Sequence, residues 1–546
     1  MTRFKWLFCA LLLTALFGTE AQGQVVNAAS CSLTDVQAAL SGVTASTATV
    51  NIPAGTCTWT TGINYTVPAG SMSLSIIGQT SCPGTTPSSC TDNTVIIDNV
   101  NHSSCNCPLL GITGNAMTSS SLRLSGLTIE QSANSVGYSN GIVGIGGYSQ
   151  NFRMDHNHFV ANSGVSSSSA FVTIYNALYG VVDHNVFDMP PGGVDNGVRV
   201  SNGGNAFGDS SGNGNGSWAN PTNPGSANAL YFENNTSNHS IINDCNDGGR
   251  QVFRFNVFND SSIQSHEMES DARGCRYTEV YKNTFNGNPS DNINSFAAVG
   301  YRMGTGLVWG NASTNMANLI MLGQDRTNGH PFGAPPGNWG YCGTEGAAPG
   351  PSGWDFNSNP SGYPCVDQVG RGQSDVLTGN FPKKCDSTTG CTTDNGAWPH
   401  NMLEPVYEWM NQYQVNGSSQ KNIYDAEDKN TMTANQDYYA YTLAWNGTSF
   451  AGTAFNGTVG TGSGILASLP STCTAGPSGA QYASPTGHYG VAYWATDANS
   501  GNGGLYVCTA TNTWTPVYTP YTYPHPLTVD SGAAPAPPTN LTAVVQ

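Results

Sequence analysis

Charged side chains are scarce in this chain. Only 9% of its 546 residues are charged, and 17 Lys and Arg stand against 34 Asp and Glu, a formal net charge of −17. So acidic a chain repels a phosphate backbone, and we expect no nucleic-acid partner. Low charge with 66 glycines would also fit disorder, but 38% hydrophobic and 10% aromatic residues indicate a folded, turn-rich β protein.

Long apolar runs are also missing. The run Trp6–Phe17 follows Arg3 and Lys5, precedes small residues, and is too short to span a bilayer comfortably. This pattern is typical of a signal peptide, which we place at residues 1–23. We therefore expect a secreted, monomeric protein without a membrane span.

The cysteines agree with export. Of the 15 cysteines, Cys9 leaves with the signal peptide, and an even 14 remain. An even number in an exported chain indicates disulfides, and a zinc site is disfavoured because Cys105-Asn-Cys107 has no second cluster at zinc spacing. The near pairs predict seven bonds, with exchange between the second and third left open: Cys31–Cys57, Cys82–Cys90, Cys105–Cys107, Cys245–Cys275, Cys342–Cys365, Cys385–Cys391 and Cys473–Cys508.

A short pattern recurs along the chain. "FRMDHNHF" (152–159) and "GVVDHNVF" (180–187) share Asp-His-Asn-x-Phe at a distance of 28 residues, and related segments follow. The spacings between the key asparagines are 28, 50, 21, 27 and 28, and the 50 predicts one degenerate unit in between. A period of 20–30 residues indicates a solenoid. The asparagines are Asn157, Asn185, Asn235, Asn256, Asn283 and Asn311.

The residues before each asparagine define two columns. Three positions before it, the residue is always apolar (Met154, Val182, Phe232, Phe253, Val280, Val308), so it should face inward, and the residue two positions before should face outward. The runs alternate and are β-branched or aromatic, which excludes helical repeats. We predict an all-β, right-handed parallel β-helix, in which His156 and His184 stack on successive coils rather than bind a metal.

The chain divides further by composition. We expect an N-terminal cap over 24–48 with a helix begun by Ser32 or Thr34, and β-helix coils over 49–325, with a long polar loop at 203–228. Residues 326–400 are rich in Cys, Gly and Pro and should form loops, and 401–527 should form final coils or a small β cap. Residues 528–546 begin as a Pro/Ala linker and end like the first strand of a fibronectin-III-like module.

Several segments resemble a known superfamily. "TVNIPAGTCTWTTGI" (49–63) with "SLSIIGQTS" (73–81) resembles the entry coil of the pectate-lyase-like superfamily, and "GGRQVFRFNVF" with "SHEMESDARGCRYTEVYKNTF" resembles a secreted bacterial branch of it. The resemblance implies a parallel β-helix. The superfamily contains lyases, hydrolases, esterases and non-catalytic adhesins; its lyases use an Arg or Lys base with Ca²⁺-binding carboxylates. The Asp-Asp and Gly-His-Gly motifs of its hydrolases are absent here.

Two groups of residues suggest a site. The outward column holds Asp155, Asp183 and Glu233, for which we expect Ca²⁺, and then Arg254, Tyr281 and Trp309. The second group is denser, because four of the 17 Lys and Arg fall within residues 250–276. We predict catalytic roles for Arg250, His266, Arg273, Arg276 and Tyr281 and substrate binding by Arg254, Glu279 and Trp309. The alternative is internal pairing between these arginines and their acidic neighbours.

These residue types favour one reaction. Arginine or a cation neutralises a uronate carboxylate, a base removes the C5 proton, and aromatic rings stack on sugars. We therefore expect a polysaccharide partner and, by preference, a lyase that acts on a uronate-containing glycan by β-elimination. The alternative is a non-catalytic extracellular protein that binds glycan in the manner of an adhesin.

Overall fold

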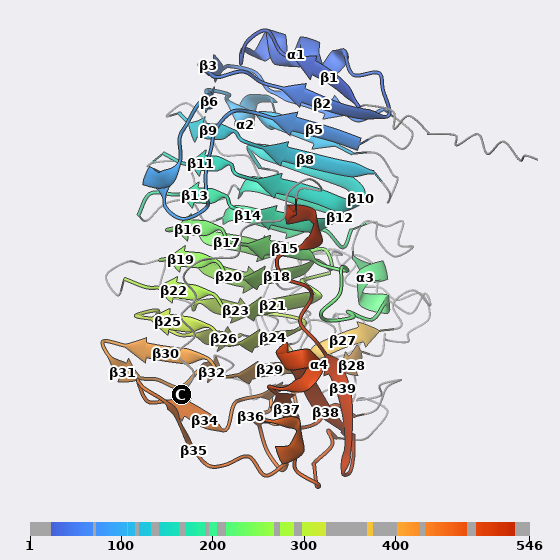
Figure 1. Cartoon of the computed structure of the whole chain (residues 1–546), viewed down its shortest axis with the longest axis vertical. Helices are drawn as coiled ribbons and strands as arrows, with labels where there is room; N and C mark the ends of the chain where they lie inside the picture. The colour runs from blue at the N-terminus through green and yellow to red at the C-terminus, as the bar shows by residue number, and fades with distance from the viewer. Residues whose placement is uncertain are drawn as a thin grey trace, which may run out of the picture.

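The computed structural model places the chain as a tall stack of strands (Figure 1). The residues that it describes are 23–68, 73–105, 107–114, 120–132, 141–162, 170–191, 196–204, 214–266, 273–288, 297–323, 369–374, 401–425, 432–477 and 488–529. The expected signal peptide, most of 326–400 and the C-terminal tail from residue 530 therefore lie outside the described residues.

The strands form three parallel ladders, and the chain visits them in turn. The first contains β2 (Thr47–Asn51), β5 (Ser73–Ile77), β8 (Ser121–Ser125), the ends of β10 (Val143–Asp155) and β12 (Ala170–Asp183), β15 (Leu230–Glu233), β18 (Arg250–Arg254), β21 (Tyr277–Tyr281), β24 (Thr305–Trp309), β29 (Val406–Trp409) and β33 (Tyr438–Tyr439). The second contains β3 (Gly55–Trp59), β6 (Thr94–Asp98), β9 (Thr128–Gln131), β11 (His158–Val160), β13 (Val186–Asp188), β16 (Thr236–Asn238), β19 (Val257–Asn259), β22 (Thr284–Asn286), β25 (Ala312–Thr314) and β30 (Gln412–Val415).

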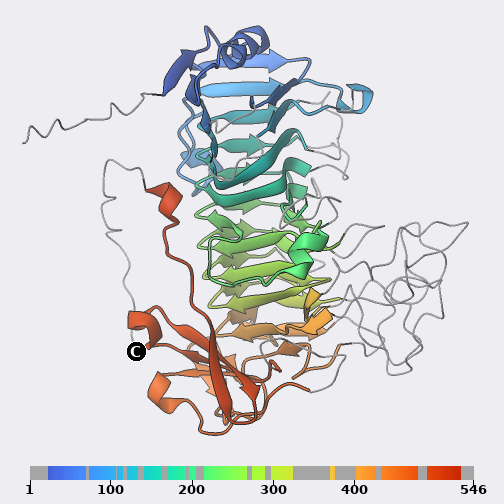
Figure 2. The same cartoon turned by 90° about the vertical axis from the view of Figure 1, so that its right-hand side faces the viewer.

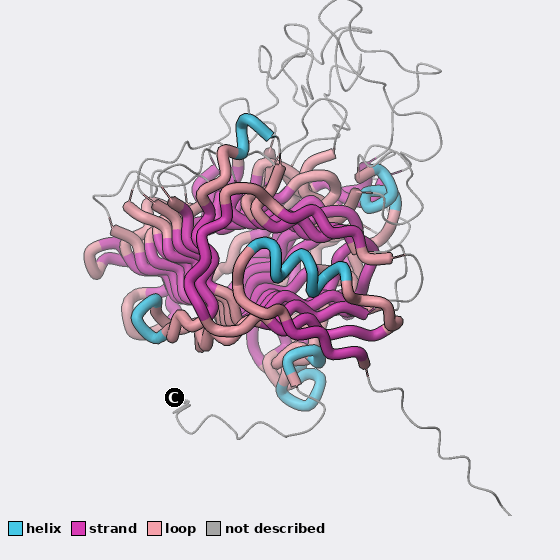
Figure 3. Tube along the Cα trace, turned by 90° about the horizontal axis from the view of Figure 1, so that it is seen from above, coloured by secondary structure: helices cyan, strands magenta, loops and turns pink. Residues whose placement is uncertain are grey.

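The third ladder closes each coil. It contains β4 (Ile63–Thr66), β7 (Leu110–Thr113), the beginnings of β10 and β12, β14 (Asn196–Ser201), β17 (Ile241–Cys245), β20 (Ser262–Ser265), β23 (Val299–Tyr301), β26 (Ile320–Leu322) and β32 (Ile423–Asp425). Seen from above, the strands of successive coils lie over one another (Figure 3). The chain is thus an all-β protein built on long parallel sheets, an arrangement consistent with a β-helix.

The inward column is confirmed. Met154, Val182, Phe232, Phe253, Val280 and Val308 are all buried and belong to the main core that runs through the stack. Aromatic residues continue this core from coil to coil: the rings of Phe232 and Phe253 stack with centroids 4.4 Å apart, and those of Phe258 and Phe285 with centroids 4.8 Å apart. These separations match the spacing between neighbouring strands, so equivalent side chains repeat once per coil.

The key asparagines form a continuous hydrogen-bonded file between the first and second ladders. In each step one Nδ2 donates to the Oδ1 of the next asparagine at 2.9–3.0 Å, from Asn157 to Asn311. The file then continues to Asn411, which lies 100 residues beyond Asn311 in the sequence. Asn185 bonds directly to Asn235, so the predicted degenerate coil between them is wrong: the extra residues form an insertion that includes helix α3 (Asn215–Ala219).

The histidines of the opening repeat stack on each other. The rings of His156 and His184 are 5.1 Å apart and within 5° of parallel, as predicted. Each residue has φ near +55° and lies directly before its asparagine, where the backbone turns from one ladder to the next. Each Nδ1 lies 2.8 Å from the neighbouring carboxylate, Asp155 or Asp183. Among the described residues no group of three His, Cys, Asp or Glu could hold a metal ion.

The N-terminal end of the stack is covered by a helix. Helix α1 (Leu33–Ser41) begins at Ser32, whose hydroxyl accepts a hydrogen bond from Asp35 N, and it lies on the top coil (Figure 1). Its buried residues Val36 and Leu40 join the main core. Strand β1 (Gln24–Asn27) extends the first ladder past β2.

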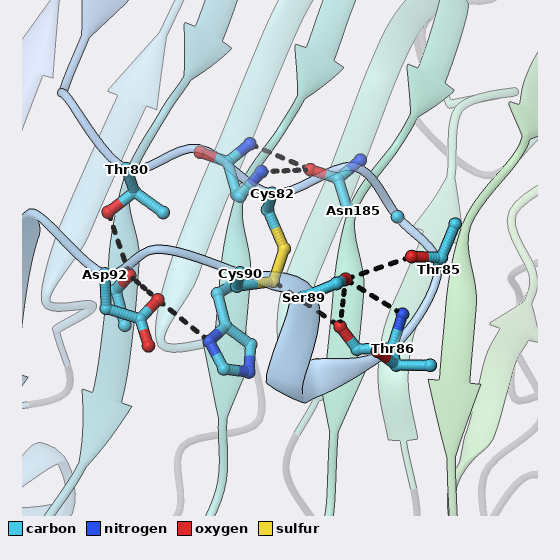
Figure 4. The surroundings of a disulfide bond; sticks show 12 residues. Thr80, Cys82, Thr85, Thr86, Ser89, Cys90, Asp92 and Asn185 are labelled. Carbon is cyan, nitrogen blue, oxygen red and sulfur yellow. Dashed lines mark hydrogen bonds and ion pairs between the residues drawn. A yellow bond between two sulfur atoms is a disulfide. The ribbon is translucent and has the colours of Figure 1, made fainter.

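The loop between β5 and β6 runs down the outer side of the second ladder (Figure 4). The disulfide Cys82–Cys90 closes it at its base, where Asp92 accepts a hydrogen bond from Thr128 and contacts His158 Nδ1 at 3.0 Å. At its tip, Thr236 of β16 donates to the carbonyls of Gly84 and Thr85. The loop therefore ties together coils that are distant in sequence.

The C-terminal part adds a second layer. Strands β36 (Thr461–Gly464), β37 (Ala492–Ala495), β38 (Gly504–Ala510) and β39 (Thr513–Tyr518) form a separate four-stranded sheet. It encloses a second apolar core against the outer side of the first ladder, with Trp309, Trp409 and Trp494 at its centre. Beyond β39, residues 519–529, here the C-terminal strap, run back along the stack past β15 to the level of β12 (Figures 1 and 2).

Five of the predicted disulfides are present in the described residues: Cys31–Cys57, Cys82–Cys90, Cys105–Cys107, Cys245–Cys275 and Cys473–Cys508. The other two predicted pairs lie outside the described residues. Five disulfides indicate an oxidising compartment. No helix in the described part of the chain is long and apolar enough to cross a bilayer.

Candidate functional site

The outward column does face away from the main core, but it is not open to solvent. Glu233 and Arg254 are 0% exposed, and Trp309 is only 5% exposed. The cover is the C-terminal layer: Arg254 donates to the carbonyls of Tyr521 and Thr522 in the strap. The groove expected on this face is therefore filled by the protein itself.

The three carboxylates predicted to bind Ca²⁺ are paired with arginines. Asp155 accepts two bonds from Arg123 at 2.7 and 2.8 Å, and Asp183 accepts two from Arg153 at 2.9 Å. Burial alone would raise the pKa of Asp155, but hydrogen bonds from Arg123 and His156 and the charge of Arg153 hold it well below its usual value.

Glu233 completes this set through Arg254 Nε at 2.8 Å. Its second oxygen accepts the His525 N–H. The guanidinium groups thus occupy the oxygens that a cation would use, and this arrangement differs from the expected calcium column.

The four clustered arginines do not converge on one open groove. Arg250, Arg273 and Arg276 are each 0% exposed. Arg250 donates to the carbonyls of Ser217, Asn220 and Pro221 and to the Ser217 hydroxyl, and so holds the α3 insertion against the stack. Burial lowers the pKa of Arg250 to about 10, the direction that a base requires, but its guanidinium is enclosed by these acceptors.

The remaining arginines of the cluster also fix insertions. Arg276 forms a two-point ion pair with Glu404 at 2.8 and 3.0 Å, and Arg273 Nε donates to Asn215 at the start of α3. The guanidiniums of both arginines also lie over the Trp218 ring. The density of arginine in this segment therefore has a structural cause, because the insertions bring carbonyls and carboxylates that these buried cations need.

The aromatic end of the outward column is also internal. Tyr281 accepts a bond from Arg254 at 2.8 Å, and its ring stacks on Trp309 at 4.5 Å. Glu279 accepts bonds from the hydroxyls of Tyr277 and Tyr518, and burial raises the pKa of its carboxyl. The cavity beside them, of 660 Å³, is lined by Tyr277, Tyr407 and Tyr518 with Pro and Leu side chains. Glu404, the carboxylate that lines this cavity, is already paired with Arg276.

A polar cleft of 540 Å³ opens on the outer side of the third ladder. Equivalent outward positions there read, coil by coil, Asn64, Gly111, Gly144, Thr173, Arg199, Asp244 and Gln264. Two successive glycines leave this face without side chains, which makes the hollow. Tyr175 forms one side, because its half-buried ring packs onto Gly146 and its hydroxyl lies 3.4 Å from Thr113 Oγ1.

A charged cluster lies at the end of this cleft, and we call it the Asp244 cluster. Arg199 Nη2 lies 3.2 Å from Asp244 Oδ2, while His266 Nε2 and Arg302 Nη2 each lie 3.8 Å from Oδ1. The three partners come from the strand β14 and from the ends of β20 and β23, so the ladder register brings them together. Arg199 and Asp247 line the cleft itself, and His266 and Arg302 lie on the next coils.

The electrostatics of this cluster differ from those of the internal ion pairs. Burial alone would raise the pKa of Asp244, but the charges of His266, Arg199 and Arg302 overcome it and lower the pKa. The side chains of Arg199 and Arg302 are 27% and 22% exposed and that of His266 is 12% exposed, so all three reach the surface. Asp244 Oδ1 accepts no hydrogen bond from any described residue.

Of the residues predicted from sequence, only His266 belongs to this cluster. Asp244 lies shortly before the predicted segment 250–276. Arg199, Arg302, Thr173 and Tyr175 gave no signal, because third-ladder strands carry no asparagine marker. The sequence pointed to these residues only indirectly, through the alternation of inward and outward side chains along β14, β17 and β20. Comparison with protein families, with curated proteins and with solved structures finds no match for this chain.

Proposed function

We propose that the protein is a secreted, carbohydrate-active right-handed β-helix of the pectate-lyase-like type, and that it cleaves a uronate-containing polysaccharide by β-elimination at the polar cleft. The observation that carries this proposal is the Asp244 cluster, where two partly exposed arginines and a histidine surround one carboxylate at the end of a polar hollow. In a chain of net charge −17, exposed cations grouped in this way favour a carboxylated ligand.

The geometry suggests how the groups would act. Arg199 and Arg302 bind the uronate carboxylate and withdraw charge from C5, which makes the C5 proton more acidic. His266 takes that proton, the electron pair forms the C4–C5 double bond, and the C4–O bond breaks. The protonated His266 then returns its proton to the leaving oxygen, so one residue serves as base and acid.

Tyr175 has a different part in this proposal. It lies three coils from His266, roughly 14 Å at 4.8 Å per coil, which is too far for proton transfer at the same bond. Its half-buried ring instead provides a face on which a more distant sugar of the chain stacks. A polysaccharide would thus lie across the strands, from the glycine hollow to the Asp244 cluster.

The test is a panel of uronate polymers, with the ultraviolet absorbance of the unsaturated product as the readout. We expect turnover of at least one polymer and a loss of about 100-fold or more in kcat for His266→Asn. His239→Asn is the matched control, since His239 also pairs with a carboxylate, Asp260 at 3.6 Å, and is partly exposed. The proposal fails if no polymer is cleaved, or if both variants lose activity equally.

Non-catalytic glycan binding is the second candidate. It is favoured by the composition of the cleft wall, where Thr, Asn, Ser and Tyr dominate and the titratable groups lie at one end. Binding of a uronate polymer without turnover, weakened by Arg199→Gln, would select this function over the lyase.

A further inference from the structure

The backbone makes one turn per coil immediately before each file asparagine, and the residue at this turn has positive φ in every case. At six of these turns the side chain is large or polar. At the seventh the residue is Gly310, so a gap opens between the side chains of the neighbouring turns. The residues at this turn are His156, His184, Asn234, Phe255, Lys282, Gly310 and Met410.

The gap is a pocket of 230 Å³, which we call the Lys282 pocket. It is lined by Lys282, Trp309, Gly310, Met410, Trp494 and Gly503. A Cβ built on Gly310 would meet only the Lys282 side chain, at 3.7 Å, so the space above the glycine is open. The pocket is on the side of the first ladder and the C-terminal sheet, whereas the polar cleft is on the third ladder.

The chemistry of the pocket combines one cation with two tryptophans. Lys282 Nζ lies 5.5 Å from the ring centroids of both Phe255 and Trp309, and makes no hydrogen bond or ion pair with any described residue. Burial and the nearby charge of Arg254 lower the pKa of Lys282, and no carboxylate among the described residues pairs with its ammonium. A carboxylate ligand would relieve this unbalanced charge.

The aromatic wall is rigid. The Trp309 ring stacks between Tyr281 at 4.5 Å and Trp409 at 5.7 Å, and the Trp494 ring packs 4.9 Å from it. Both tryptophans are 5% exposed, so only the part of each ring that faces the pocket is available. Because these rings are already fixed, they can bind a ligand without a further loss of their own conformational entropy.

We propose that the Lys282 pocket binds a single carboxylate-bearing sugar ring, with the Lys282 ammonium on the carboxylate and the tryptophan faces against the ring. The pocket is smaller than the roughly 300–1,000 Å³ of drug-sized sites, which fits one ring and not a chain. This inference rests on the proposed function for its ligand class, since both sites then recognise uronates, but the two sites lie on different faces.

The experiment is a titration of the full chain with glucuronate, followed by tryptophan fluorescence, with glucose as the neutral match. We expect a saturable change with glucuronate only, an at least tenfold weaker affinity in Lys282→Gln, and wild-type affinity in the control Lys421→Gln, which removes another exposed lysine. Gly310→Asn should also abolish binding, because asparagine accepts positive φ, as Asn234 does, and its side chain would fill the pocket.

Each outcome decides the proposal. Equal responses to glucuronate and glucose, or unchanged affinity in Lys282→Gln, would overturn it. The Lys282 side chain is partly exposed and its Nζ forms no hydrogen bond or ion pair with any described residue, so we expect its substitution to keep the fold even if Gly310→Asn does not. Binding that persists in His266→Asn assigns the signal to the Lys282 pocket, and turnover without this binding would refute the pocket while leaving the polar cleft intact.

Discussion

Removal of one asparagine from the central file should destabilise the protein strongly. Asn256 is 2% exposed, and its Oδ1 accepts from both the backbone N and the Nδ2 of Asn235, at 2.9 and 3.0 Å. Its Nδ2 donates to Phe232 O at 2.9 Å and to Asn283 Oδ1 at 3.0 Å. Alanine at this position leaves the buried Asn235 N–H without its acceptor and removes one bond each from Asn235 Nδ2, which keeps Val182 O, and from the Phe232 carbonyl.

The magnitude follows from those groups. A buried polar group that loses its partner costs about 1–3 kcal/mol, so Asn256→Ala should lower the free energy of unfolding by about 3–5 kcal/mol. Urea unfolding monitored by tryptophan fluorescence measures this change. Asn286→Ala is the matched control, because Asn286 is exposed and, among the described residues, its side chain bonds only to Asn259, in an outer asparagine row on the second ladder.

We expect Asn286→Ala to change the free energy of unfolding by less than about 1 kcal/mol. Equal losses in the two variants would refute the reasoning, because burial of the inner file would then contribute nothing. A loss below about 1 kcal/mol for Asn256→Ala would refute it as well.

Three further predictions concern pairings elsewhere in the stack. Arg276→Ala leaves Glu404 buried without its partner and should lower the free energy of unfolding in urea by about 3–5 kcal/mol. The double variant Arg276→Met with Glu404→Leu should recover most of this loss. Equal losses in the two variants would contradict the pairing. Burial and the Arg254 charge lower the pKa of His525 in the strap to about 4. The folded state therefore binds fewer protons than the unfolded state between about pH 4 and 6.5. The free energy of unfolding should fall by up to about 3 kcal/mol as the pH drops through this window. Burial raises the pKa of Glu233, so Glu233 changes the free energy of unfolding in the opposite direction over this pH range. The difference between the pH profiles of wild type and His525→Gln therefore isolates the contribution of the histidine. Identical profiles would contradict the prediction. Replacing Cys245 and Cys275 by Ser opens a loop with a sequence separation of 30 and should cost about 3–4 kcal/mol in thermal unfolding; an unchanged midpoint would contradict it.

The architecture was predictable because its signal is local. An apolar residue lies three positions before each asparagine from Asn157 to Asn311, and the side chain of each asparagine bonds to residues of its own and adjacent coils, so the repeated pattern and its spacing indicated the parallel stack. Asn411 was missed because it lies 100 residues beyond Asn311, several times the usual spacing, and because the residue three positions before it is Glu408. The degenerate coil was wrong because spacing cannot distinguish an extra coil from an insertion.

The surroundings of the predicted site residues depended on contacts that no local pattern contains. Arg254 is covered by carbonyls more than 260 residues away, at Tyr521 and Thr522, and Arg276 meets its carboxylate at Glu404. The polar cleft depends on the register of the third ladder. Loops of unequal length separate its strands, so the approach of Arg199 and Arg302 to Asp244 could not be inferred from spacing.

The most direct test of the proposed uronate site in the polar cleft is a crystal structure of His266→Asn with a bound oligouronate. We expect the sugar chain to lie across the third ladder, with a carboxylate within hydrogen-bond distance of Arg199 or Arg302 and another sugar on the Tyr175 ring. An oligouronate that leaves the polar cleft empty and binds on another face of the stack would contradict it.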